Sequence, residues 1–158
     1  MANILIFCAH SDDQVIGPGG TVAKYSREGH DVYTYIFSYG VMANPWLKED
    51  YVTKVRRKES EKADRIIGGK GVEFFDLPEG KFREEAKKKG VHDEIIRIIK
   101  EKEPEKIFTH TINDPHPDHR ALHNLVLEAF DDSGSEAEVY TFRVWNVVDV
   151  KRRNVPKF

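Results

Sequence analysis

Two short segments of the chain concentrate histidine and carboxylate side chains. The first begins at position 10 and reads His-Ser-Asp-Asp, and the second begins at position 113 and reads Asn-Asp-Pro-His-Pro-Asp-His. Each segment holds a pair of potential ligands three positions apart: His10 with Asp13, and His116 with His119. Because residues at that spacing project to one side of a turn, two such pairs can converge on one ion.

The residue types narrow the chemistry of such a site. Two or three imidazoles with one carboxylate and no thiolate form the donor set of catalytic zinc, which keeps three protein ligands and leaves a position for water. Iron, cobalt and manganese fit these donors less specifically. Asp12, beside the expected ligand Asp13, would then be a base that accepts a proton from water. Spacing alone does not decide whether His116 or His119 is the ligand.

A simpler interpretation exists for each segment taken alone. Two aspartates after a strand often serve as a helix N-cap and a turn, and a single His-x-x-Asp motif is a weak signal. The presence of a second ligand-rich segment favours the metal site, because both segments follow expected central strands. The first strand is the apolar run from Ile4 to Ala9, the second is Lys106 to His110, and His110 is itself a weaker candidate to line the cleft.

The rest of the chain alternates between strand and helix patterns. Further strands are expected over Asp31 to Ser38, Val72 to Leu77 and Val139 to Val148. Helices are expected from Thr21 towards Gly29, from Lys48 to Ile67, from Phe82 to Lys102, and around Ala121 to Phe130. This alternation predicts an α/β fold with an open, mostly parallel sheet of about five strands and helices on both faces. Ligands bind such sheets at the carboxyl ends of the strands, where both segments lie.

Composition excludes several classes of protein. A length of 158 residues predicts one domain. The 25 Lys and Arg residues against 27 Asp and Glu residues lack the basic excess that nucleic-acid binding requires. The single cysteine, Cys8, excludes an internal disulfide framework and a cysteine-based zinc ribbon, and favours a cytoplasmic location. The N-terminal apolar run is too short to insert into a membrane.

Both segments carry a family resemblance. Residues 9–23 resemble the signature loop of the PIG-L/LmbE-like zinc-dependent N-deacetylases, usually written Ala-His-Pro-Asp-Asp-Glu and followed by a Gly-rich helix start. Residues 113–120 resemble the His-Pro-Asp-His motif of that family. Segments between them, among them Gly29 to Val32 and Phe75 to Gly80, fall in the family order, so the likeness covers most of Met1 to about Phe130.

The resemblance implies a Rossmann-like sheet and roles for individual residues. One zinc ion per chain would be bound by His10, Asp13 and His119. Asp12 would be the general base, and His116 would stabilise the oxyanion and protonate the leaving amine. Asp118 would orient His116 by accepting its other ring N–H. The implied reaction removes an acetyl group from an N-acetylglucosamine-type conjugate.

The resemblance also suggests substrate contacts and partners. Arg56 matches a substrate-contacting arginine, with Arg57 as an immediate rival, and Asn113 is the other expected substrate contact. The partner would be a small N-acetylated sugar, and the family often forms homo-oligomers.

Departures from the family pattern support a second hypothesis. Ser11 stands where the motif has proline, and Gln14 stands where it has glutamate. A third departure concerns length: the chain is expected to be one domain over residues 1–158 that is short at its C-terminus relative to the family. The alternative function is a non-catalytic member that binds a metal or a small ligand. A nucleotide-binding domain is disfavoured, because the glycines from Gly17 to Gly20 lack the Gly-x-Gly-x-x-Gly spacing.

Overall fold

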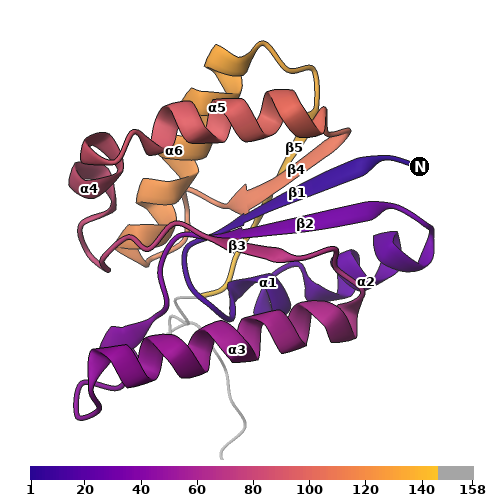
Figure 1. The fold of residues 1–158 in the computed structure, drawn as a ribbon. Coiled ribbons are helices and arrows are strands. Elements are labelled where there is room, and N and C mark those ends of the chain that lie inside the picture. The colour runs from indigo at the N-terminus through magenta and orange to yellow at the C-terminus, as the bar shows by residue number, and fades with distance from the viewer. Residues whose placement is uncertain (146–158) are drawn as a thin grey trace, which may run out of the picture.

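The computed structural model describes residues 1–145 and contains one five-stranded sheet with the strand order β3-β2-β1-β4-β5 (Figure 1). All four neighbouring pairs of strands are parallel. The strands are β1 (Asn3–Cys8), β2 (Asp31–Ile36), β3 (Val72–Phe74), β4 (Lys106–His110) and β5 (Glu138–Phe142). The predicted parallel α/β architecture is confirmed.

Helices cover both faces of the sheet (Figure 1). One face carries α1 (Asp13–Ile16), α2 (Gly19–Arg27) and α3 (Glu49–Ile67). The other carries α4 (Phe82–Lys88), α5 (Val91–Lys102) and α6 (Pro117–Ser133). A short 3-10 turn, η1 (Val41–Ala43), follows β2. Within residues 1–145, none of these helices has the length and apolar character needed to cross a membrane.

The side chains of β1 divide between two hydrophobic clusters, one on each face. Leu5 and Phe7 pack with residues of α4, α5 and α6, whereas Ile4, Ile6 and Cys8 pack on the side of α2. All five side chains are at most 1% exposed. A strand buried on both faces reads as a continuous apolar run, which explains the sequence of β1.

Two predicted elements differ from the observed ones. The sequence predicts a single helix from Phe82 to Lys102, and this prediction is wrong: the helix is divided at Gly90, whose φ of 64° is a left-handed conformation that favours glycine. The expected strand over Val139 to Val148 is observed as β5, which ends at Phe142. Positions 146–148 of that expectation lie outside the described residues.

The strand order explains why the two ligand-rich segments meet. The chain runs outwards from β1 through β2 to β3, and then returns to place β4 on the opposite side of β1. The carboxyl ends of β1 and β4 are therefore adjacent, and the crevice at such a switch point is where open α/β sheets bind ligands. The first segment leaves β1 there, and the second leaves β4.

Gly17, between α1 and α2, has no room for a side chain. A Cβ atom would lie 2.4 Å from Cδ2 of Phe142, whose ring packs against His110 with 4.6 Å between ring centroids. We expect Gly17→Ala to lower the free energy of unfolding by about 1–3 kcal/mol, measured by urea denaturation. Gly20→Ala is the matched control, because nothing lies within 4 Å of its Cβ position. Equal stability of the Gly17 variant and the unmodified chain would contradict this packing.

Candidate active site

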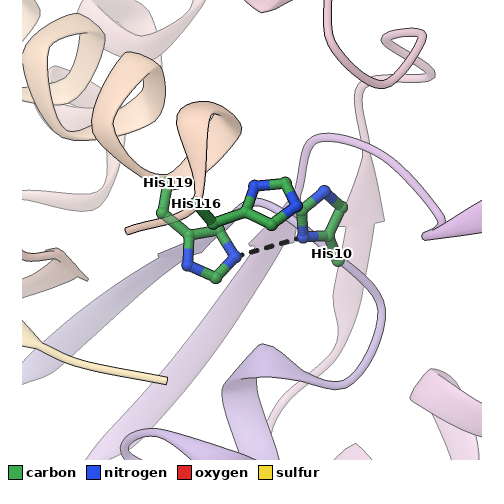
Figure 2. A group of neighbouring side chains, drawn as sticks. All are labelled: His10, His116 and His119. Atoms are coloured by element: carbon green, nitrogen blue, oxygen red, sulfur yellow. Dashed lines mark hydrogen bonds between the residues drawn. The ribbon is translucent and has the colours of Figure 1, made fainter. Parts of the chain in front are cut away.

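Three histidines from the two segments meet where β1 ends and α6 begins (Figure 2). His10 follows β1, His116 is the N-cap residue of α6, and His119 lies in the first turn of that helix. Pro117 occupies the first helical position, where its missing N–H costs nothing. The helix start therefore fixes the spacing of His116 and His119 and directs both towards His10.

Three donor atoms form a compact triangle in this group. Nδ1 of His10 lies 3.2 Å from Nε2 of His119, and Oδ2 of Asp13 lies 3.5 Å from Nε2 of His119 and 3.7 Å from Nδ1 of His10. The three side chains are at most 8% exposed. Ligand atoms placed about 2.0–2.2 Å from a tetrahedral zinc ion lie about 3.3 Å from one another. The donors thus have the spacing that a small divalent cation requires.

Other donors overlap with this triangle. His116 joins His10 and His119 in a group whose ligand atoms all lie within 4.8 Å of one another, and His110 forms a similar group with Asp13 and His119. His110 is fully buried, with Nε2 3.1 Å from Oδ2 of Asp13 and its ring stacked on His119 at 3.8 Å between centroids. The weaker candidate His110 therefore lies within the site.

Asp12 lies beside these donors and contacts Arg56. Its carboxylate oxygen is 3.1 Å from Nη2 of Arg56, and its side chain is 46% exposed. Although Asp12 is the N-cap residue of α1, its side chain makes no capping hydrogen bond there. Asp12 therefore occupies the N-cap position without capping α1 through its side chain.

The structure distinguishes Arg56 from Arg57. Nε of Arg56 donates to the carbonyl oxygen of Tyr39 at 3.0 Å, which holds its guanidinium beside Asp12. Arg57 instead donates to the hydroxyl oxygen of Tyr39 at 3.2 Å and lies over the ring of Phe74. Of the two arginines, Arg56 is the one whose guanidinium contacts Asp12. Asn113 is exposed in the loop before α6, where its backbone N–H donates to Oγ1 of Thr111.

Asp118 makes contacts that differ from the expected ones. Its carboxylate lies 3.2 Å from Nε2 of His10 and accepts from the Gly80 N–H at 3.0 and 3.1 Å. The hydrogen bond that joins Asp118 to His116 runs from the Asp118 backbone N–H to Nδ1 of His116, at 3.2 Å. Because Nδ1 accepts, a neutral His116 ring carries its proton on Nε2. Burial lowers the pKa of His116, and the neighbouring His10 lowers it further, which favours that neutral ring.

Asp114 contacts the ring nitrogen of His119 that is not part of the donor triangle, a role that the sequence did not assign. Its Oδ1 lies 3.1 Å from Nδ1 of His119 and accepts from the His116 backbone N–H, while Oδ2 accepts from the backbone N–H groups of Val144 and Trp145. Burial lowers the pKa of His119 to about 4, with a further contribution from His110. A neutral imidazole is the form that binds a metal. The only signal for Asp114 was its place in the second segment.

The pKa of Asp114 makes stability depend on pH. Burial acts to raise this pKa, but hydrogen bonds from the backbone N–H groups of His116, Val144 and Trp145, together with the nearby His119 ring, outweigh it and lower the pKa from 3.8 to about 2. A lowered carboxyl pKa stabilises the fold above the unfolded value, here by about 2 kcal/mol, and the effect is lost as the pH falls from about 4 towards 2. We expect Asp114→Asn to unfold more readily by this amount near neutral pH. Urea denaturation in the presence of chelator measures the free energy of unfolding of both proteins, and the difference between Asp114→Asn and the unmodified chain should shrink as the pH falls from about 4 towards 2. A difference that does not change with pH would contradict this role of Asp114.

The fold and this site together define a class: a Rossmann-like α/β protein with a cluster of histidine and carboxylate donors at the switch point of its sheet. The chain belongs to the PIG-L family, because the family model described as GlcNAc-PI de-N-acetylase matches residues 5–130. The family resemblance inferred from the two segments is confirmed.

Individual relatives agree with this membership. The chain is 33% identical to mycothiol S-conjugate amidase of Streptomyces coelicolor, an alignment that covers 84% of this chain and 52% of the relative. It is 30% identical to diacetylchitobiose deacetylase of Thermococcus kodakarensis, over 83% of this chain and 50% of the relative. The chain thus spans about half the length of these curated relatives.

Solved structures show the same fold with more than one named activity. The 4-carboxy-2-hydroxymuconate hydratase of Pseudomonas putida KT2440 matches with a TM-score of 0.76 and 27% identity, over 89% of this chain and 65% of the hydratase. The N,N'-diacetylchitobiose deacetylase of Pyrococcus horikoshii matches with a TM-score of 0.70 and 27% identity, over 82% of this chain and 49% of the deacetylase. A shared fold does not settle the reaction, so function must be argued from the site.

Proposed function

We propose that this chain is a metal-dependent amide hydrolase that removes the acetyl group from an N-acetylated amino sugar of the N-acetylglucosamine type. The observation that carries the proposal is the triangle of donors from His10, Asp13 and His119, with the carboxylate of Asp12 beside it. The amidase and deacetylase activities named for the relatives support the same reaction class.

In this proposal His10, Asp13 and His119 hold one zinc ion per chain. Zinc in a site of this kind acidifies water and polarises a carbonyl group. Asp12, next to the ligand Asp13 in the chain, takes the proton from the attacking water, and its carboxylate is paired with the guanidinium of Arg56. The neutral form of His119 suits its role as a ligand.

His116 stabilises the oxyanion and protonates the leaving amine. Its Nδ1 accepts from the Asp118 backbone, so its Nε2–H donates a hydrogen bond to the developing oxyanion. His116 then passes one proton to the leaving amine and is reprotonated with the proton that Asp12 took from water. Cleavage of the C–N bond then releases acetate and the amine. Asp118 is retained as a positioning residue, acting on His116 through its backbone N–H and on His10 through its carboxylate.

Substrate contacts and cellular setting complete the proposal. Arg56 contacts the substrate from its place beside Asp12, and Asn113 does so from the exposed loop before α6. The near balance of 25 basic and 27 acidic residues favours a small sugar over nucleic acid as the partner. The single cysteine, which is buried, favours a cytoplasmic location.

The direct test is acetate release from a panel of N-acetylglucosamine derivatives, with zinc-loaded protein and with protein treated with chelator. We expect release with zinc and loss of release with chelator. Full activity of the metal-free protein would overturn the proposal.

One observation favours the second candidate, a member that binds a metal or a small ligand without catalysis. Gln14 replaces the glutamate of the family motif, and its side chain is fully buried in α1. Neither polar atom of that side chain has a hydrogen-bond partner within residues 1–145. This candidate predicts zinc binding without turnover of any acetamide in the panel.

A further inference from the structure

The turn between β3 and α4 places a carboxylate near Nε2 of His10, the ring nitrogen that is not part of the donor triangle. Oε1 of Glu79 lies 3.6 Å from Nε2 of His10, and the Glu79 side chain is only 9% exposed. Its other oxygen, Oε2, accepts from the Met42 backbone N–H at 2.6 Å. Glu79 thus faces the ring nitrogen of His10 opposite Nδ1, the atom that belongs to the donor triangle.

A second carboxylate meets the same ring nitrogen and is held by the same turn. Oδ2 of Asp118 lies 3.2 Å from Nε2 of His10, and both oxygens of Asp118 accept from the Gly80 N–H. Gly80 has a φ of 74°, a left-handed conformation that favours glycine. Two adjacent residues of one turn therefore act together, since Glu79 contacts His10 directly and Gly80 fixes the other carboxylate.

The turn is anchored on both sides of Glu79. Before it, Leu77 is 2% exposed and its backbone N–H donates to the carbonyl oxygen of Phe37 at 2.7 Å. After it, Phe82 is 2% exposed, and its ring centroid lies 6.2 Å from that of His10. With both flanks in the core, the backbone that carries Glu79 is fixed relative to His10.

We propose that Glu79 is a positioning residue of the metal centre. Its carboxylate, together with that of Asp118, orients His10 with Nδ1 towards Asp13 and His119 and makes that nitrogen a stronger donor. Carboxylates behind a ligating histidine typically change metal affinity by about 10–100-fold when they are removed. The inference rests on the proposed function, because it assigns to Glu79 a role in the same metal site.

The test compares zinc affinity, measured by competition with a chromophoric chelator, between the unmodified chain and Glu79→Gln. The glutamine is nearly isosteric and can still accept from Met42, so mainly the charge is lost. We expect about 10–100-fold weaker binding at an unchanged stoichiometry of one ion per chain. Glu79→Asp retains the charge and should recover part of the affinity. Glu84→Gln is the matched control, because Glu84 is 64% exposed and pairs with Lys88 on the surface, and it should bind zinc like the unmodified chain.

Thermal melting in the presence of chelator separates positioning from simple stability. Glu79→Gln and the unmodified chain should melt alike without metal and differ when zinc is added. Equal zinc affinities of Glu79→Gln and the unmodified chain would overturn the inference and leave the proposed function intact. A melting temperature of Glu79→Gln that is lowered equally with and without zinc would have the same consequence. A second ion, bound at Nε2 of His10 and lost in Glu79→Gln, would overturn it by making Glu79 a ligand. Failure of the unmodified chain to bind zinc would overturn both.

Discussion

Replacing His119 by alanine is expected to abolish zinc binding and acetate release together. His119 contributes one of three donor atoms, and its Nε2 lies within 3.5 Å of the other two. Removal of a residue behind a ligand costs about 10–100-fold in affinity, so removal of the ligand itself should exceed about 100-fold. Zinc affinity by chelator competition and acetate release at several zinc concentrations would measure both effects.

His116→Ala is the matched control for this prediction. The two histidines lie in the same helix start, and spacing alone does not say which one is the ligand. If His119 is the ligand, His116→Ala keeps zinc affinity within a few-fold and loses turnover by about 10²–10⁴-fold, because a proton donor is missing. The reverse pattern, with zinc lost in His116→Ala and kept in His119→Ala, would exchange the two roles.

The sequence was sufficient to predict that the two segments meet. An apolar run marked β1 as a buried strand, the segment Lys106 to His110 was expected as a further strand, and parallel strands place their carboxyl ends on one edge. The two ligand-rich segments were therefore expected to converge. The pairing of β1 with β4, in which Ile4 is opposite Lys106, provides that convergence. Hydrophobic periodicity and the direction of the chain are local properties of the sequence. They are therefore sufficient to predict where each strand ends and at which edge of a parallel sheet that end lies.

Contacts that depend on a third segment could not be predicted in this way. The carboxylate of Asp118 contacts His10 and Gly80, although the expectation was a contact with the ring of His116. Gly80 lies in the turn that follows the edge strand β3. The spacing of residues within the second segment contains no information about the position of that turn. Glu79 was not predicted for the same reason. The division of the helix at Gly90 was not predicted either, because it depends on a left-handed backbone angle at one residue, whereas the sequence on both sides of Gly90 has a helical pattern.

Gln14 shows how burial changes the meaning of a departure from a motif. Its amide lies in the interior at 0% exposure, so the loss of a glutamate there removes a charge from the core and not from the surface. A buried carboxylate without a partner is costly.

Asp12→Asn is expected to lower kcat by about 10²–10⁴-fold while zinc binding is retained. The carboxylate of Asp12 is 46% exposed beside the donor triangle and contacts Arg56. The asparagine side chain is nearly isosteric and can still accept from Arg56, but it cannot take a proton from water. The decisive measurement is kcat at saturating zinc, together with zinc affinity for the same protein.

Asp93→Asn is the matched control, because Asp93 is 90% exposed on α5 and its carboxylate pairs with His92, outside the donor triangle. It should keep both kcat and zinc affinity. A fall in zinc affinity of Asp12→Asn parallel to the fall in kcat would make Asp12 a ligand, and an unchanged kcat would remove it from the mechanism. Loss of turnover with metal retained would separate the roles of two adjacent aspartates: Asp13, which is buried within the donor triangle, would bind the metal, and Asp12, which is exposed and paired with Arg56, would accept the proton.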